Sequence, residues 1–242
     1  MALNCTTLVL HVKEGYEDRR IHMERMLKAH GISFEYILDG DMCDITEEIL
    51  DRYFTSETMH QVSPHTSCAL KHLYACEYIV KNNLKGALVL EDDMELYANF
   101  DTVFGKCLEE IDRRQLQAPL VAFDDSNLRF VPRSQRRKGI FLYPAQRDRY
   151  TGCLYYSYGV AKQILDYVAE HKCDLFIDGF HTALIGRIGL HYYWSHPTIA
   201  SQGTHNGLFA SSINADYARK QGYRARAWYF KLLYKKLLYF FR

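Results

Sequence analysis

The stretch ALVLEDDMEL, residues 87–96, places four apolar residues directly before three adjacent carboxylates, Glu91, Asp92 and Asp93. A buried strand can end in such a cluster only if a partner compensates the repulsion between the charges. In open α/β sheets, ligands bind beyond the carboxyl ends of the strands. If the chain stays extended, Glu91 and Asp93 point to one side, and such a pair suits a hard cation such as Mg²⁺ or Mn²⁺. The alternative is an acidic first turn of a helix.

The order of the other segments predicts an α/β fold. The chain has 242 residues, of which 48% are hydrophobic, which is enough for the core of one domain. Residues 7–12 and 34–38 are predicted strands, and residues 21–30 between them have helical spacing, so the chain begins with a β-α-β unit and a parallel sheet. Further helices are predicted over residues 46–54, 67–82, 100–116 and 159–168 and from about residue 180, and further strands over residues 87–90, 120–123, 150–158 and 191–194. Residues 195–212 are expected to form a polar loop.

Basic charge is concentrated near the C-terminal end of the chain. The formal net charge is only +1, so we expect no nucleic-acid partner, yet no acidic residue follows Asp216. We therefore divide the chain into a domain, residues 1–215, and a basic amphipathic extension, residues 216–242. At helical spacing one narrow stripe of the extension contains Arg224, Lys231, Lys235 and Arg242. Basic residues among aromatic and leucine side chains are typical of a helix on an anionic membrane surface, and a helix docked on protein is the alternative.

The cysteines and the N-terminal segment favour a cytoplasmic location. The seven cysteines are scattered, and no two have the spacing of a zinc or redox motif, so we expect reduced thiols. The apolar run over residues 7–12 is too short for a signal peptide or a membrane span. We expect a cytoplasmic protein that is peripheral on the inner face of the cytoplasmic membrane through its extension.

Several stretches of the chain resemble glycosyltransferase family 25, the bacterial lipopolysaccharide and lipooligosaccharide glycosyltransferases. The matching stretches are GISFEYILDGD, SCALKHLYACEYIV, LKGALVLEDDMEL, RYTGCLYYSYGVAKQIL and LFIDGF. Ser67 and Lys71 depart from the family pattern, which usually has Gly and Ser there. The resemblance implies a GT-A-like fold, a Rossmann-type mixed sheet flanked by helices. It also implies inverting transfer of a hexose, usually galactose, from a UDP-sugar to a lipopolysaccharide, lipooligosaccharide or related surface glycan, with Mn²⁺ or Mg²⁺ as cofactor.

Carried onto this chain, the family's acidic motif makes Asp93 the direct metal ligand. Glu91 would share the cation, and Glu91 or Asp92 would hold the ribose of the nucleotide sugar. A departing nucleoside diphosphate carries developing negative charge, which a bridging cation stabilises. His205 is the predicted third metal ligand, with His196 as its rival and a solvated loop histidine as the alternative.

An inverting transfer also needs a general base, and Asp178 is the candidate. Apolar neighbours would raise its pKa, although an Asp followed by Gly also caps helices.

Three residues are candidates for the nucleotide-sugar site. Arg20, in the Arg19-Arg20 pair, could bind phosphate or stack on a base, or simply begin a helix. Asp39 could bind uracil or ribose, or belong to an Asp-Gly turn. His72 could contact the donor or sit in a helix core.

Two other functions compete with glycosyl transfer. Clustered acids at strand ends also serve metal-dependent phosphoester hydrolases, but the sequence contains no clear nucleophilic Asp or second metal cluster. A non-catalytic, membrane-associated adaptor is the other possibility.

Overall fold

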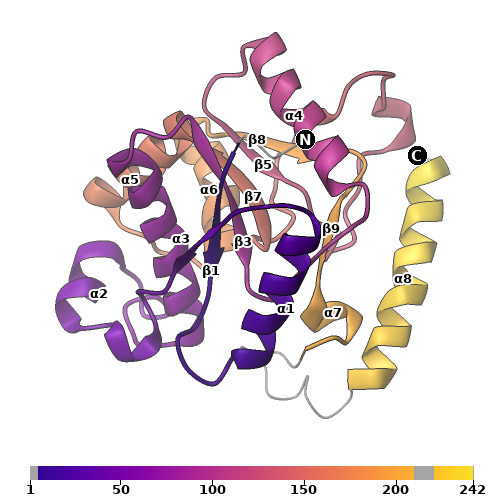
Figure 1. Ribbon diagram of the computed structural model, residues 1–242. Coiled ribbons are helices and arrows are strands. Elements are labelled where there is room, and N and C mark those ends of the chain that lie inside the picture. Colours follow the sequence, from indigo (N-terminus) through magenta and orange to yellow (C-terminus); the bar gives the residue numbers. More distant parts are fainter. Residues whose placement is uncertain (1–4, 210–220, 242) are drawn as a thin grey trace.

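A mixed, seven-stranded sheet forms the centre of the molecule (Figure 1), as seen in a computed structural model that describes residues 5–209 and 221–241. The strand order is β2-β1-β3-β7-β5-β8-β6. The strands are β1 (Thr6–Leu10), β2 (Glu35–Ile37), β3 (Gly86–Glu91), β5 (Pro119–Ala122), β6 (Leu142–Pro144), β7 (Cys153–Ser157) and β8 (His191–Ser195). β1 is parallel to both β2 and β3, and β5 is parallel to β8. β7 is antiparallel to β3 and β5, and β6 is antiparallel to β8. The expected mixed sheet and its parallel β-α-β beginning are therefore confirmed.

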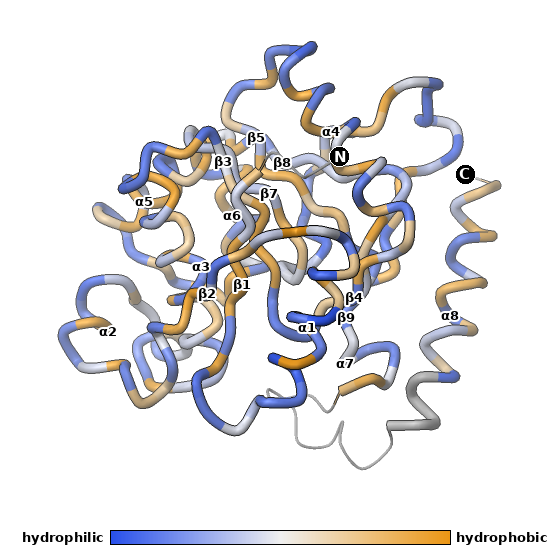
Figure 2. Tube along the Cα trace, viewed as in Figure 1, coloured by the Kyte–Doolittle hydropathy of each residue, from blue (hydrophilic) through white to orange (hydrophobic). Residues whose placement is uncertain are grey.

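Helices cover both faces of the sheet. On one face lie α1 (Glu17–Ala29) and α4 (Phe100–Arg114), and on the other lie α3 (Pro64–Lys81), α5 (Tyr158–His171) and α6 (Ile177–Ile188). Shorter helices follow β2, namely η1 (Met42–Asp44) and α2 (Glu47–Tyr53), and η2 (Arg133–Gln135) precedes β6. Successive strand residues point to opposite faces, so Leu8 packs with α3 whereas Val9 packs with α1. Figure 2 shows the hydrophobic residues concentrated in the central strands.

Two helices begin earlier than the apolar spacing indicates, and each early start has a local cause. Pro64 occupies the first turn of α3, and the Ser63 hydroxyl accepts a hydrogen bond from the Thr66 N–H, so the helix starts three residues before residue 67. α1 starts at Glu17, and Glu17 and Asp18 in its first turn suit the positive end of the helix dipole. Both early starts bring additional side chains to the same end of the sheet.

The segment expected to be a polar loop, residues 195–212, contains regular structure, so that prediction is wrong. β9 (Ala200–Gln202) pairs with β4 (Met94–Leu96) in a small antiparallel sheet, and α7 (Gly203–Asn206) follows it. Strands of three residues are too short to give a periodic signal, and their pairing partner is distant in the chain. This small sheet holds α7 beside the turn at residues 92–93.

The C-terminal extension forms the helix α8 (Gln221–Phe241), which Figure 1 shows beside α7 along the right of the molecule. One face of α8 packs on the body: Leu232 is buried, and the indole N–H of Trp228 donates to the Ser126 carbonyl at 3.4 Å. The Lys236 ammonium lies 3.7 Å from a carboxylate oxygen of Asp125. The side chains of Arg224 and Arg242, part of the predicted basic stripe, lie outside the described residues. Among the helices that the structure describes, none has the length and apolar character that crossing a membrane requires.

Candidate active site

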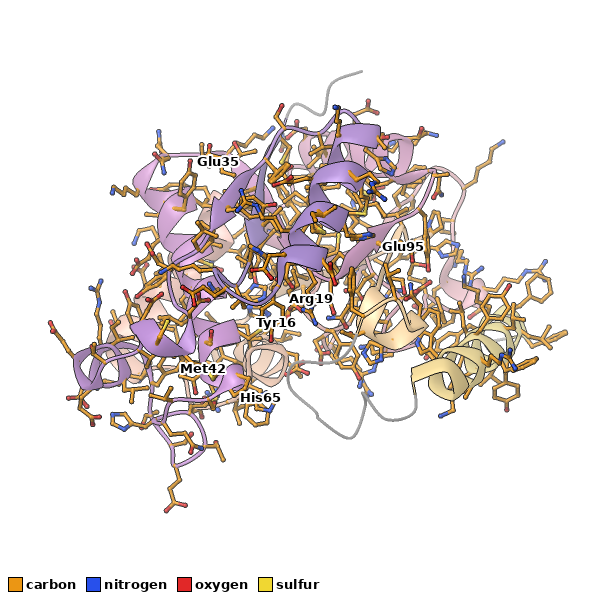
Figure 3. The ribbon with its side chains drawn as sticks, turned by 60° about the horizontal axis from the view of Figure 1, so that its bottom comes forward. Tyr16, Arg19, Glu35, Met42, His65 and Glu95 are labelled. Carbon is orange, nitrogen blue, oxygen red and sulfur yellow. The ribbon has the colours of Figure 1, made fainter. Side chains whose placement is uncertain are left out.

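A cavity of about 530 Å³ opens at the carboxyl ends of β1 and β3. It is lined by residues from both faces of the sheet, including Tyr16 just before α1, Arg19 of α1, His65 and Lys71 of α3, Asp178 of α6, and Thr204 and His205 of α7. Figure 3 shows Tyr16, Arg19, Met42 and His65 at the end of the molecule that faces the viewer. In the strand order, β1 lies between β2 and β3. The chain therefore adds β2 on one side of β1 and later adds β3 on the other side. Such a switch point is where open α/β sheets bind ligands.

The three adjacent carboxylates lie at this cavity. Glu91 is the last residue of β3, and Asp92 and Asp93 form the turn that leads into β4. The alternative of an acidic helix N-terminus is therefore wrong, because a strand and not a helix follows. Each of the three carboxylates has different surroundings, and these surroundings separate their roles.

Asp92 is held by two basic side chains. One carboxylate oxygen accepts a hydrogen bond from the Arg19 guanidinium at 2.8 Å, and the other lies 2.8 Å from the His11 Nδ1. Burial opposes ionisation of Asp92, but the hydrogen bond from His11 and the charge of Arg19 outweigh burial and lower its pKa. Asp92 is therefore an ionised group that fixes Arg19 at the wall of the cavity.

Glu91 is oriented by three hydrogen-bonding side chains. The Thr151 hydroxyl donates to it at 2.7 Å, the Gln202 amide at 3.0 Å, and His72 Nε2 lies 3.3 Å away. Burial again opposes ionisation, but the hydrogen bonds from His72 and Thr151 and the charge interaction with His72 together outweigh burial, so the pKa of Glu91 is lowered. His72 itself is buried behind Glu91 in α3, where its Nδ1 lies 3.0 Å from the Tyr156 hydroxyl. It supports Glu91 and is not part of the cavity wall.

Asp93 is the carboxylate with an uncompensated oxygen. Its Oδ2 accepts from the Thr204 hydroxyl at 2.8 Å, whereas its buried Oδ1 has no hydrogen-bond partner among residues 5–209 and 221–241. Burial, and then the charge of Glu91, raise the pKa of Asp93 to about 7. A Cβ on Gly203 would lie 2.9 Å from the Asp93 carbonyl oxygen, so only glycine lets this turn and α7 approach so closely. A buried oxygen without a partner, beside a second carboxylate, fits the ligand set of a divalent cation.

His205 lines the cavity from α7, and burial lowers its pKa, so its imidazole is neutral, as a metal ligand must be. Its ring stacks on Tyr150 with 5.7 Å between the ring centroids. The predicted trio of Glu91, Asp93 and His205 does not bring three ligand atoms within 4.8 Å of one another. In the part of the chain that the structure describes, Glu91 instead forms such a group with Cys68 and His72.

Asp178 lies in the first turn of α6 and lines the cavity, as a general base must. Burial raises its pKa. The residue preceding the helix is Phe176, and no side chain caps this helix end. The carboxylate of Asp178 accepts a hydrogen bond from the N–H of its neighbour Gly179 at 2.8 Å. Asp178 is therefore not the N-cap residue of α6, and the helix-cap alternative is wrong.

Besides His72, three residues named from the sequence lie outside the cavity wall. The Arg20 guanidinium is exposed and pairs with Glu24 at 3.0 Å, and the Asp39 side chain is 85% exposed near Lys13. His196, the rival of His205, is absent from the lining as well. Arg19 occupies the position expected of Arg20, because a helix that starts at Glu17 turns Arg19 inward.

Lys71, where the family pattern has Ser, builds part of the cavity wall. Its ammonium is buried and lies within 3.2 Å of four oxygens: the carbonyls of His11, Leu38 and Asp39, and the carboxylate of Asp41. The carbonyls belong to the segments that follow β1 and β2. Lys71 therefore ties the two strand ends together beside the cavity.

Comparison with known proteins assigns the chain to a family. The model of glycosyltransferase family 25 (LPS biosynthesis protein) matches residues 9–149, more than half of the chain. The chain therefore belongs to glycosyltransferase family 25, and it is a glycosyltransferase. A search of the curated proteins finds no match.

Two solved structures are similar in shape only. One is a glycosyltransferase involved in the glycosylation of the major capsid of PBCV-1, with a TM-score of 0.48 and 11% identity over 90% of this chain and 97% of that one. The other is described as a mannose-1-phosphate geranyltransferase from Thermus thermophilus, with a TM-score of 0.27 and 12% identity over 94% of this chain and 49% of that one.

Proposed function

We propose that this glycosyltransferase moves galactose from UDP-galactose to a lipopolysaccharide, lipooligosaccharide or related surface glycan, with inversion at the anomeric carbon and with Mn²⁺ or Mg²⁺ as cofactor. The observation that carries the metal dependence is the buried, unpartnered Oδ1 of Asp93 beside Glu91 in the described part of the chain. When bound there, a divalent cation would neutralise the charge that develops on the departing UDP.

The donor fits the crevice between the ends of β1 and β3. Arg19 lines it with a guanidinium that Asp92 holds in place, so its charge is pre-positioned for a diphosphate. Tyr16, whose ring lies 4.9 Å from the Arg19 guanidinium, supplies an aromatic surface at the same wall. Glu91 and Asp93 face this wall from the end of β3 and the turn that follows it.

Asp178 is the proposed base. A hydroxyl oxygen of the acceptor attacks the anomeric carbon of the donor, the bond between that carbon and the UDP oxygen breaks, and the hydroxyl proton passes to the Asp178 carboxylate. The raised pKa of Asp178 brings its basicity closer to that required near neutral pH.

The test of the base is Asp178→Asn, assayed for UDP release from UDP-galactose in the presence of Mn²⁺ and a lipooligosaccharide acceptor. We expect transfer to fall at least about a hundredfold, because general-base catalysis typically contributes that much. Binding of UDP, measured by calorimetry, should stay close to the wild-type value. Transfer at the wild-type rate would reject the role of Asp178.

We also propose that α8 attaches the enzyme to an anionic membrane surface, where a glycolipid acceptor would lie. The face of α8 opposite Trp228 and Leu232 exposes apolar side chains at helical spacing, namely Phe230, Leu233, Tyr234, Leu237 and Phe241. Exposed Arg226 and Lys231 accompany them, and Figure 2 shows the alternation of polar and apolar residues along α8. An apolar face with basic residues is what an interfacial helix presents to anionic lipid.

A further inference from the structure

A stacked pair of aromatic rings stands at the cavity beside Asp178. The rings of His65, at the start of α3, and Phe176, directly before α6, lie 3.9 Å apart with 17° between their planes. Both side chains line the cavity. Phe176 remains 42% exposed although His65 covers one of its faces, so the rest of its surface is open. An exposed phenylalanine in a cavity wall has an energetic cost that a bound ligand would remove.

The position of the pair separates it from the donor crevice. Tyr16 and Arg19 reach the cavity from the start of α1, on one face of the sheet, whereas His65 lies in α3 and Phe176 directly before α6, on the other. Asp178 is two residues from Phe176 and lines the same cavity. A hydroxyl that gives its proton to Asp178 must lie next to that carboxylate, so the group bearing the hydroxyl lies on the side of the stacked rings.

We propose that His65 and Phe176 form an acceptor subsite that binds a pyranose ring by stacking. The inference rests on the proposed function, in which Asp178 is the base. One face of a β-galactoside carries several C–H groups with small positive partial charges, and the face of an aromatic ring is negative, so the two surfaces attract and exclude water. The stack also selects the class of acceptor, because the exposed ring of Phe176 is a flat apolar surface that suits a sugar ring and offers no charge to a phosphate or a peptide carboxylate.

The stacked rings and Asp178 would have different roles in the reaction. Asp178 would act on any acceptor hydroxyl placed beside it, whereas the stacked rings decide which acceptor is held there. Loss of the rings should therefore raise the KM for the acceptor far more than it changes the binding of UDP.

The test uses methyl β-D-galactopyranoside as probe, titrated against the full-length enzyme by saturation-transfer NMR, with and without UDP and Mn²⁺. Phe176→Ala should weaken glycoside binding about tenfold or more, whereas Phe176→Trp should retain it. Phe176→Leu keeps an apolar side chain but has no ring, so it should lose glycoside binding as Phe176→Ala does. Because leucine fills more of the space than alanine, this variant guards against a folding defect in Phe176→Ala. Ile188→Ala, at the exposed far end of the same helix, is the matched control and should bind as the wild type does.

Three results would overturn the subsite: no glycoside signal with the wild-type enzyme, equal binding by Phe176→Ala, or an equal loss of UDP affinity in Phe176→Ala. The last would place the nucleotide on the rings. Failure of the proposed function is separate: if glycoside binding requires the Phe176 ring but UDP-galactose is never turned over, the subsite stands and the donor assignment falls.

Discussion

Asp93 differs from Glu91 and Asp92 in how the protein compensates its carboxylate. Asp92 is compensated by Arg19 and His11, and Glu91 by His72, Thr151 and Gln202, so both are held ionised. The Asp93 carboxylate accepts from the Thr204 hydroxyl. The repulsion evident in the sequence is thus relieved at two of the three residues by protein groups, and we propose that a cation relieves it at the third.

The raised pKa of Asp93 predicts how the stability of the metal-free protein depends on pH. Its folded pKa is about 7 against an ordinary value of 3.8, so between these values the native state holds a proton that the unfolded state has released. The stabilisation is therefore complete below about pH 4 and is lost as pH rises through about 7, with a magnitude on the order of 4 kcal/mol. Urea unfolding in EDTA across this pH range measures it.

Asp93→Asn should flatten this decline, because the amide does not titrate. Asp166→Asn, at an exposed position of α5, should leave the slope as in the wild type. Parallel pH profiles for the wild type and Asp93→Asn would contradict the assignment of the raised pKa to Asp93.

Cavity residues could be predicted from the sequence only where they belong to a recognisable motif. The acids at 91–93 and the candidates Asp178 and His205 all line one cavity, although Asp178 and His205 lie in helices and not in loops. The choice of Arg20 over Arg19 failed because neighbouring helical residues point about 100° apart, and the direction depends on where α1 begins. Thr151, Gln202 and Thr204 carry no motif, and only the tertiary fold brings them to the acids.

At the scale of elements, strands and helices with strong apolar patterns were predicted within a few residues. β4, β6 and β9 were not, because three-residue strands depend on their pairing partners and not on their own pattern. Of these three strands, β9 has the largest effect on the cavity. Its pairing with β4 places the Gln202 amide against Glu91 and places α7 against the turn at Asp93.

Lys71 is the side chain that joins elements around the cavity, and Lys71→Met tests its role. The side chains of Lys71 and Asp41 are only 5% and 6% exposed, so removal of the ammonium leaves a buried charge and three carbonyls without their partner. We expect the free energy of unfolding to fall by about 3 kcal/mol, measured in urea. Lys162→Met, which breaks an exposed pair with Asp166, should leave the free energy of unfolding close to the wild-type value. Equal costs for the two variants would show that Lys71 does not join the strand ends.

At the scale of the whole molecule, α8 presents one face to the body and the other to its surroundings. Cosedimentation with vesicles containing anionic phosphatidylglycerol tests the membrane proposal. The wild-type enzyme should bind, and binding should weaken as salt rises, because screening reduces the attraction of Arg226 and Lys231 to the headgroups. Leu237→Asp, on the outer face of α8, should reduce binding about tenfold.

Ile188→Asp is the control for that experiment, because it places the same charge at an exposed apolar position of α6, away from α8. It should bind vesicles as the wild type does. Vesicle binding that survives Leu237→Asp would reject α8 as the attachment site, and binding that fails in both variants would point to another surface of the molecule.

The most direct test of the central claim, that the Asp93 carboxylate beside Glu91 holds the cation required for transfer, is UDP release from UDP-galactose. The wild-type enzyme should release UDP with Mn²⁺, lose at least about a hundredfold of that rate in excess EDTA, and regain it when Mn²⁺ is restored. Asp93→Asn should stay inactive at every Mn²⁺ concentration while remaining folded. Turnover that is insensitive to EDTA, or that survives Asp93→Asn, would contradict the claim.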